Sequence, residues 1–174
     1  MSQEILFIRG LHVRSAQSFL ILDDEQTVND LLKDYLLTLN FTGQIFQAYT
    51  IEEAKLILKE NKPDYILSDW NLPDGKGVHL LQAVRSTQKF QNTPFLMITA
   101  NDDIESMMTS SKIGVSEYLV KPFNLKDFEQ KLAEGWKYHL VKEEQFITDL
   151  QDEIKKLRNE NRLLKDEIHK FRGL

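Results

Sequence analysis

The chain has 174 residues, of which 22 are basic and 27 acidic, for a net charge of −5 at pH 7, and it contains no cysteine. This acidic balance argues against a general nucleic-acid binder, which normally presents a basic face. A chain without cysteine has neither disulfides nor thiolate metal ligands, and no apolar run reaches the roughly 18 residues of a membrane span. We expect a cytoplasmic protein with one domain of ordinary size and an appended segment.

Residues 1–17 lead into this domain without a clear hydrophobic pattern. Three interpretations remain open for them: a disordered arm, a remnant of expression, or an extra strand. We treat them as an N-terminal extension.

From residue 19 onward, short apolar runs alternate with helical patterns. The runs predict strands at 19-FLIL-22, 45-IFQAY-49, 65-YILS-68, 95-FLMI-98 and 118-YLV-120. Apolar residues at a spacing of about 3.6 predict helices over 28–40, 51–60, 78–90 and 103–113. Strands that alternate with helices indicate βαβ units and a parallel sheet, and nearly continuous apolar strands indicate that helices cover both faces. The sequence therefore predicts an α/β fold, a doubly wound five-stranded parallel sheet over about 19–135.

Polar side chains follow four of these predicted strands. Asp23 and Asp24 follow the first strand, Asp69 the third, Thr99 the fourth and Lys121 the fifth. The carboxyl ends of parallel strands meet at one edge, where open α/β sheets bind ligands. Each residue could instead be a cap or turn former, but their joint order along the strands favours a site.

The chemistry of this group points to phosphoryl transfer. Three crowded carboxylates repel one another unless a cation joins them, and Mg²⁺ prefers a few carboxylates with waters. A metal, a lysine and a hydroxyl together form a receptor for the oxygens of a phosphoryl group. A carboxylate in that receptor can act as a nucleophile and become an acyl phosphate.

The residues of this edge resemble a family. They are similar to those of a response-regulator receiver domain of the chemotaxis type, from two-component phosphorelay signalling, which has a flavodoxin-like fold. The resemblance covers about 19–135 and includes Asp23-Asp24, 69-DWNLP-73 with Gly75 and Gly77, Thr99-Ala100, and Lys121-Pro122-Phe123.

The resemblance implies a role for each matching residue. Asp69 is the expected phosphoacceptor, and the expected Mg²⁺ ligands are Asp23, Asp24, Asp69 and the backbone carbonyl of Asn71. Thr99 and Lys121 would hold the phosphoryl group.

The same resemblance implies a switch and partners. Thr99 and Tyr118 would form the switch, and the Lys121–Pro122 peptide would be cis. The phosphodonor would be a sensor histidine kinase or a phosphotransfer protein. No enzymatic activity is expected beyond self-phosphorylation and autodephosphorylation at Asp69.

Other chemistry-bearing residues are interpreted as structural. The four histidines, His12, His79, His139 and His169, lack a metal-ligand spacing, and we interpret them as solvated. Trp70 is interpreted as a surface or partly packed residue.

The C-terminal segment predicts a long helix. Asn124 is a good N-cap with Asp127 in the first turn, and no proline follows before Phe171. Gly135 is the only residue that weakens the helix, so we expect the fifth helix of the domain to continue into the tail.

Beyond residue 146 the apolar spacing becomes 3, 4, 3, 4, as in a coiled coil. Position a holds Ile147, Ile154, Asn161 and Ile168. Position d holds Leu150, Leu157, Leu164 and Phe171. Isoleucine at a with leucine at d favours a parallel dimer, and one asparagine at a fixes its register. Glutamates at g face basic residues at e, which also suits a parallel homodimer.

Two alternatives for the tail remain. An amphipathic helix folded back on its own domain fits poorly with the Asn161 in its apolar stripe. A basic-zipper DNA reader would need a basic region before the zipper, where this chain has 142-KEEQ-145.

We therefore predict three parts: an N-terminal extension over 1–17, a receiver domain over 18–138, and a parallel dimeric coiled coil over 139–174. The predicted function is that of a response regulator phosphorylated on Asp69 that signals through its dimeric helix to an unknown downstream protein, without direct contact to nucleic acid or membrane. Two alternatives are an N-terminal fragment of a larger regulator with an enzymatic output domain, and a structural dimerisation module that is never phosphorylated.

Overall fold

The computed structural model describes residues 5–100 and 112–172 of the chain. The chain divides into two units, Met1–His139 and Leu140–Leu174. The first unit contains the sheet and its helices, and the second consists of the remainder of the last helix. Within the described residues, no helix combines the length and the apolar character that crossing a membrane requires.

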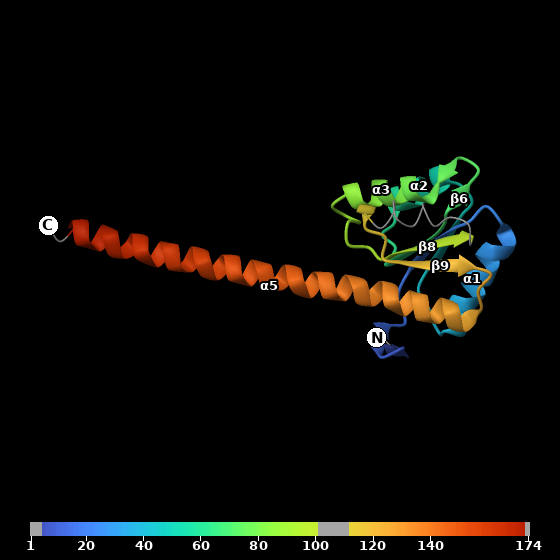
Figure 1. The fold of residues 1–174 in the computed structure, drawn as a ribbon, viewed down its shortest axis with the longest axis horizontal. Helices are drawn as coiled ribbons and strands as arrows, with labels where there is room; N and C mark the ends of the chain where they lie inside the picture. The colour runs from blue at the N-terminus through green and yellow to red at the C-terminus, as the bar shows by residue number, and fades with distance from the viewer. Residues whose placement is uncertain (1–4, 101–111, 173–174) are drawn as a thin grey trace. The chain divides into compact units, whose positions relative to one another are not determined.

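A parallel five-stranded sheet forms the centre of the first unit (Figure 1), with the strand order β4-β3-β5-β8-β9. Its strands are β3 Phe19–Leu22, β4 Ile45–Ala48, β5 Tyr65–Asp69, β8 Phe95–Ala100 and β9 Glu117–Lys121. This confirms the predicted doubly wound sheet of the flavodoxin-like type. The order reverses between β3 and β5, which is where such sheets bind ligands.

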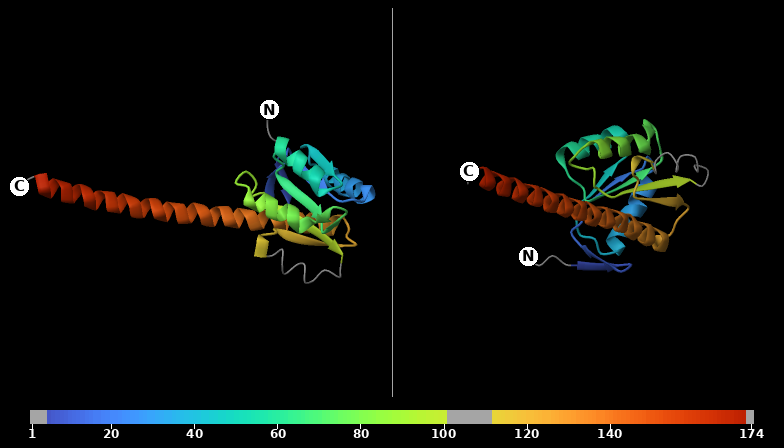
Figure 2. Two further views of the ribbon diagram at one scale, coloured as in Figure 1. Left: turned by 90° about the horizontal axis from the view of Figure 1, so that it is seen from above. Right: turned by 60° about the vertical axis from the view of Figure 1, so that its left-hand side comes forward.

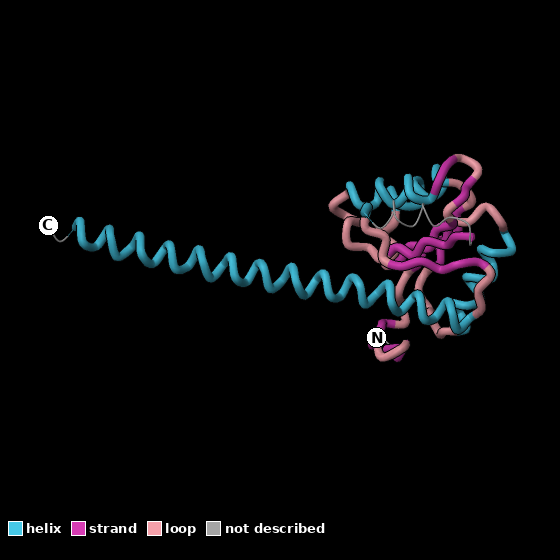
Figure 3. Tube along the Cα trace, in the orientation of Figure 1, coloured by secondary structure: helices cyan, strands magenta, loops and turns pink. Residues whose placement is uncertain are grey.

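Helices cover both faces of the sheet (Figures 1 and 2). The described helices are α1 Gln26–Thr38, α2 Ile51–Glu60, α3 Gly77–Ser86 and α5 Leu125–Arg172. The predicted helix at 103–113 lies almost wholly outside the described residues. The secondary-structure trace in Figure 3 shows the alternation of strands with helices along the chain.

Two apolar clusters, one on each face, explain this layering. Leu20 and Ile66 point to the cluster shared with α2 and α3. Their neighbours Phe19 and Leu67 point to the opposite cluster, shared with α1 and α5. Successive residues of a strand face opposite sides of the sheet, so strands that are apolar at every position can hold helices on both.

The N-terminal extension contains a β-hairpin. Its strands β1 Ile5–Ile8 and β2 Leu11–Arg14 are antiparallel, and the two residues between them, Arg9 and Gly10, both have positive φ, as a tight hairpin turn requires. Ile8 and Val13 are only 3% and 7% exposed, in the cluster with α1 and α5. A disordered arm is therefore wrong for residues 5–17, because burial of this hairpin face stabilises it.

The last helix begins as its sequence predicts. The Asn124 side chain accepts hydrogen bonds from the backbone N–H groups of Lys126 and Asp127 at 2.8 and 3.1 Å. The helix then continues through Gly135. A Cβ on Gly135 would lie 2.0 Å from the hydroxyl oxygen of Tyr65, so this glycine permits the close packing of α5 on β5.

Buried polar groups gather at the amino ends of the central strands. Ser116 Oγ accepts a hydrogen bond from Phe95 N at 2.7 Å and lies 2.6 Å from His139 Nε2. Tyr65 Oη donates to the Leu132 carbonyl at 3.3 Å. We call this the amino-end cluster. His139 is 6% exposed, so the interpretation of His139 as solvated is wrong, because a serine on the sheet gives its ring a buried hydrogen-bond partner.

Candidate functional site

Three of the charged residues predicted from the strand ends meet at the carboxyl edge of the sheet. Asp23 directly follows β3, Asp69 ends β5 and Lys121 ends β9. The Lys121 ammonium lies 2.8 Å from Asp23 Oδ2 and 2.7 Å from Asp69 Oδ1. Asp23 is fully buried and Asp69 is 6% exposed. One lysine thus joins two buried carboxylates at the point where the strand order reverses.

Backbone groups hold the two carboxylates in place. Asn71 N donates to Asp69 Oδ2 at 2.6 Å, and Glu25 N donates to Asp23 Oδ1 at 3.0 Å. The buried Asn29 side chain donates to the Asp23 carbonyl at 2.6 Å. The first two bonds orient the carboxylates and the third holds the Asp23 backbone, so the site is preorganised before any ligand binds.

A glycine is required at position 77, beside Asp69. A Cβ at this position would lie 2.2 Å from the Asp69 carbonyl oxygen, and the Gly77 N–H donates to the Trp70 carbonyl at 2.8 Å. Helix α3 therefore begins in direct contact with the chain that follows Asp69. Trp70 itself is 6% exposed and belongs to the cluster with α2 and α3, so its interpretation as a surface or partly packed residue is wrong, because the apolar core buries its ring.

Burial and charge act in opposite directions on the ionisation of this site. Burial raises the pKa of Asp69 above its ordinary value, and the hydrogen bond and charge of Lys121 reduce that rise. Burial alone would lower the pKa of Lys121, but its bonds to Asp23 and Asp69 outweigh it and the pKa is raised. Lys121 is therefore positively charged at neutral pH, and additional positive charge near Asp69 would favour its ionised form.

A short hairpin follows Asp69 and contacts the start of α2. Strands β6 Asn71–Leu72 and β7 Gly75–Lys76 pair with each other, and the Asp74 carboxylate accepts hydrogen bonds from Ile51 N and Glu52 N at 3.0 and 3.1 Å. Burial would raise the pKa of Asp74, but these backbone hydrogen bonds, together with a third from Asp74 itself and the charge of Lys55, outweigh it and lower the pKa. The first turn of α2 is thus capped by the loop that begins at Asp69.

Sequence reasoning missed several residues of this framework. In the sequence, Asp74 looks like an ordinary turn residue. The helix that it caps begins 23 residues earlier, at Ile51. Lys76 contacts the Asn71 side chain. Asn29, which donates to the Asp23 carbonyl, has the sequence context of an ordinary helical residue. The local sequence carries no signal for these partners.

Of the remaining predicted residues, Asp24 and Thr99 lie at the same edge, and Tyr118 lies near the start of β9. Thr99 is 2% exposed and follows Ile98, which pairs with Asp69 in the sheet register. Asp24 follows Asp23 and is exposed. Tyr118 is half-buried against the cluster shared with α2 and α3, and the Lys121–Pro122 peptide is cis, as the resemblance implied. Their functional roles remain predictions.

The donor atoms at this edge suit a hard cation. Asp23 and Asp69 contribute carboxylate oxygens, the ligand type that Mg²⁺ prefers. Among the described residues, no group of three acidic or histidine side chains is arranged to hold a metal ion. Lys121 instead lies between Asp23 and Asp69 and offsets one of their two negative charges.

Comparison with known proteins identifies the family to which this sheet topology belongs. The family model of the response regulator receiver domain matches residues 19–133. The chain belongs to this family. Receiver domains of response regulators are generally signalling domains without enzymatic activity, and this chain is a receiver of the CheY-like type.

Individual relatives support the assignment. The chemotaxis protein CheY of Pseudomonas aeruginosa is 33% identical over 113 residues, which cover 65% of this chain and 90% of that protein. The chemotaxis protein CheY-3 of Vibrio cholerae is 34% identical over 115 residues, covering 65% and 86%. A CheY-like receiver domain protein from Methanospirillum hungatei has a TM-score of 0.64 at 24% identity, covering 72% of this chain and 98% of that one, and shows the fold alone.

Proposed function

We propose that this protein is a response regulator that accepts a phosphoryl group on Asp69 from a histidine kinase or a phosphotransfer protein. The observation that carries the proposal is the Lys121 ammonium between Asp23 and Asp69, at 2.8 and 2.7 Å. An Asp69 carboxylate oxygen attacks the phosphorus of a phosphohistidine. The new O–P bond forms as the P–N bond breaks, and the imidazole leaves with a proton from solvent.

The surrounding residues stabilise the charge that this step moves. Mg²⁺ would be held by Asp23, Asp24, Asp69 and the Asn71 carbonyl, and when bound it supplies positive charge to the phosphoryl oxygens. Lys121, already joined to the acceptor carboxylate, would pair with the transferred phosphoryl group. Thr99 would donate its hydroxyl to the same group.

A shift of Thr99 and Tyr118 would carry the signal outward. In this proposal Thr99 moves toward the phosphoryl group and Tyr118 turns inward, which changes the surface near β9. The size of this shift is limited by the difference between the interaction free energies of the phosphoryl group with the two conformations.

Labelling with radioactive acetyl phosphate and Mg²⁺ tests the acceptor. We expect the wild-type protein to be labelled and the Asp69→Asn variant to show at least about a hundredfold less label, because an amide is no nucleophile for this step. Asp34→Asn, an exposed carboxylate on α1, is the matched control and should label normally. Undiminished label on Asp69→Asn would overturn the proposal and favour a structural module.

We further propose that the tail forms a parallel homodimer. In the single chain, the described apolar residues of the a and d positions are 40–55% exposed, namely Ile147, Leu150, Ile154, Leu157, Leu164 and Ile168. The Phe171 side chain lies outside the described part. A stripe of this length that stays exposed calls for a partner helix, and Asn161 within it favours a second copy in register.

Sedimentation at micromolar concentration tests the dimer. We expect a dimer for the full chain, and Asn161→Ile should raise its stability while broadening the range of oligomers, because a buried asparagine trades stability for specificity. Asn159→Ile makes the same chemical change outside the a and d positions and should leave the dimer unchanged. A monomeric wild-type chain would refute the homodimer. Adding beryllofluoride as a phosphoryl mimic then tests whether phosphorylation alters the dimer.

A further inference from the structure

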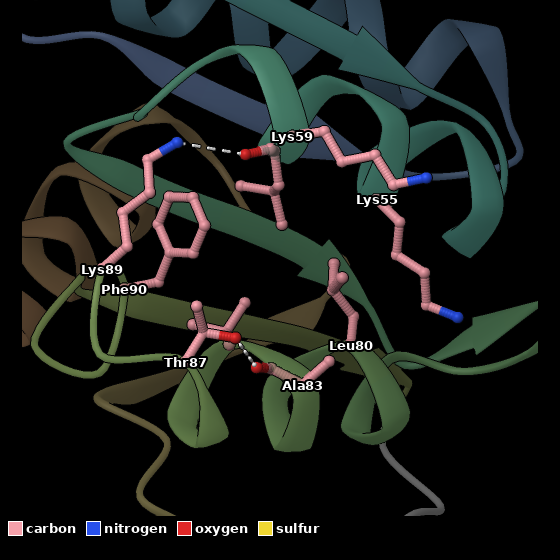
Figure 4. A pocket seen from close by; sticks show the side chains of 9 residues that line it. Lys55, Lys59, Leu80, Ala83, Thr87, Lys89 and Phe90 are labelled. Atoms are coloured by element: carbon pink, nitrogen blue, oxygen red, sulfur yellow. Dashed lines mark hydrogen bonds between the residues drawn. The ribbon is translucent and has the colours of Figure 1, made fainter.

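A groove runs between α2 and α3, with a volume of about 390 Å³ (Figure 4). Its floor is apolar and is formed by Leu58, Leu80, Val84 and Phe90. All four are less than 9% exposed, so the floor is part of the packed core and is held rigidly. The groove residues include none of Asp23, Asp69 and Lys121, so the groove is separate from the site at the carboxyl edge.

Three lysines surround this floor. Lys55 and Lys59 come from α2 and lie one helical turn apart, and Lys89 comes from the loop that follows α3 (Figure 4). Lys89 Nζ donates to the carbonyls of Leu58 and Asn61 at 3.3 and 3.1 Å and lies 4.7 Å from the centre of the Phe90 ring. The position of this cation is therefore fixed at one end of the groove.

The charge at the groove is opposite to that of the chain. The nine residues that line it include three lysines and no acidic residue, whereas the whole chain carries a net charge of −5. Lys55 forms an exposed ion pair with Glu52, which contributes little. Within the described part of the chain, Lys59 has no ion-pair partner. A complementary ligand must combine apolar groups for the floor with carboxylates for the rim.

We propose that this groove docks an acidic amphipathic helix of a partner protein. A helix lays its apolar face into a groove through residues at i, i+3, i+4 and i+7. Carboxylates at i and i+4 of that helix would meet Lys55 and Lys59, which have the same spacing on α2. A third carboxylate on the opposite flank would meet Lys89.

A labelled synthetic peptide tests the proposal. The probe is an amphipathic helix of about 15 residues, the length at which isolated helices become marginally stable, with leucine and phenylalanine on one face and glutamates on both flanks. Its control has lysine in place of every glutamate. Fluorescence anisotropy with the full chain should show saturable binding of the acidic peptide alone, weakened by salt because the rim is exposed.

Substitutions at the groove locate the binding. Lys59→Glu should weaken the acidic peptide roughly five- to tenfold, since it replaces a weak attraction with a repulsion of similar size. Ala83→Phe fills the groove without changing charge and should weaken it as well. Lys126→Glu makes the same charge change in the exposed first turn of α5 and should have no effect. Unchanged thermal melting of each variant would exclude unfolding as the cause.

Two results would overturn the proposal. One is equal binding of the acidic and basic peptides, or no binding of the acidic peptide up to about millimolar concentration. The other is Lys59-dependent binding to phosphatidylglycerol vesicles without binding to the peptide, which would assign the groove to an anionic membrane surface.

Discussion

The two ends of the parallel strands differ in how their buried polar groups are compensated. At the carboxyl ends, Asp23 and Asp69 are buried as charges and share one lysine. At the amino ends, the amino-end cluster joins Ser116, His139 and Tyr65 to neighbouring groups through hydrogen bonds. Burial, and to a smaller extent the charge of Glu117, raise the pKa of Tyr65 well above its ordinary value, so its hydroxyl stays neutral.

This difference separates function from stability. A buried carboxylate is unfavourable unless a cation compensates it, and at the carboxyl edge one ammonium serves two carboxylates. Under the proposed function, a further cation or a phosphoryl group would change this state. A buried neutral group whose hydrogen bonds are all made contributes to the stability of the fold. Substitutions at the amino ends should therefore affect stability alone, and those at the carboxyl ends should affect chemistry more than stability.

The largest effect on stability is expected for Gly135→Ala. Alanine in place of a helical glycine normally stabilises by about 1 kcal/mol, but here its Cβ would lie 2.0 Å from Tyr65 Oη. We expect a loss of about 2–3 kcal/mol, as for overpacked cores, measured by chemical denaturation. Adding Tyr65→Phe removes the clashing oxygen, so the double variant should lose less than the sum of the single variants. A stabilised Gly135→Ala protein would disprove the close contact.

An intermediate effect is expected for Ser116→Ala. The change removes the acceptor of the Phe95 N–H group and the partner of His139 Nε2, and a buried group left unsatisfied costs about 1–3 kcal/mol. Ser86→Ala, on an exposed helical serine, is the matched control and should change little. Acetyl phosphate labelling of Ser116→Ala should match the wild type at temperatures where it is folded. Impaired labelling of the folded variant would contradict the expectation that substitutions at the amino ends affect stability alone.

The smallest effect, and one of opposite sign, is expected for Asp69→Asn. Burial raises the pKa of Asp69 above the ordinary value of 3.8, so the unfolded chain ionises first as the pH rises. The wild type then loses stability relative to the uncharged variant as the pH passes through the raised pKa. Without Mg²⁺, Asp69→Asn should be the more stable protein at pH 7, and its advantage should shrink toward pH 4.

Denaturant titrations between these two pH values measure the difference. Asp34→Asn should show no comparable dependence on pH, because that carboxylate is exposed. A less stable Asp69→Asn at pH 7 would mean that the Lys121 ion pair outweighs burial.

Much of the fold could be predicted from single segments. An apolar run such as 19-FLIL-22 predicts a buried strand by itself, and alternation with helices leads to the parallel sheet. Because parallel strands end at one edge, the meeting of Asp23, Asp69 and Lys121 follows from the topology. Asn124 likewise caps α5 through N–H groups only two and three residues away.

Other features depend on partners far away in the chain. Asp74 caps a helix that begins 23 residues earlier, and Ser116 and His139 are 23 residues apart. The hairpin at Arg9 and Gly10 is stable only where Ile8 and Val13 find a core to pack on.

The sequence by itself determined the order of strands and helices, the residues that end at the carboxyl edge, and the heptad pattern of the tail. Each of these follows from a periodicity or a spacing within a few residues. Only the tertiary structure decided that Gly135 must lack a side chain, that His139 is buried, and that a groove with three lysines lies between α2 and α3. Those facts arise from the packing of one segment against another, and no local pattern encodes which surfaces will touch.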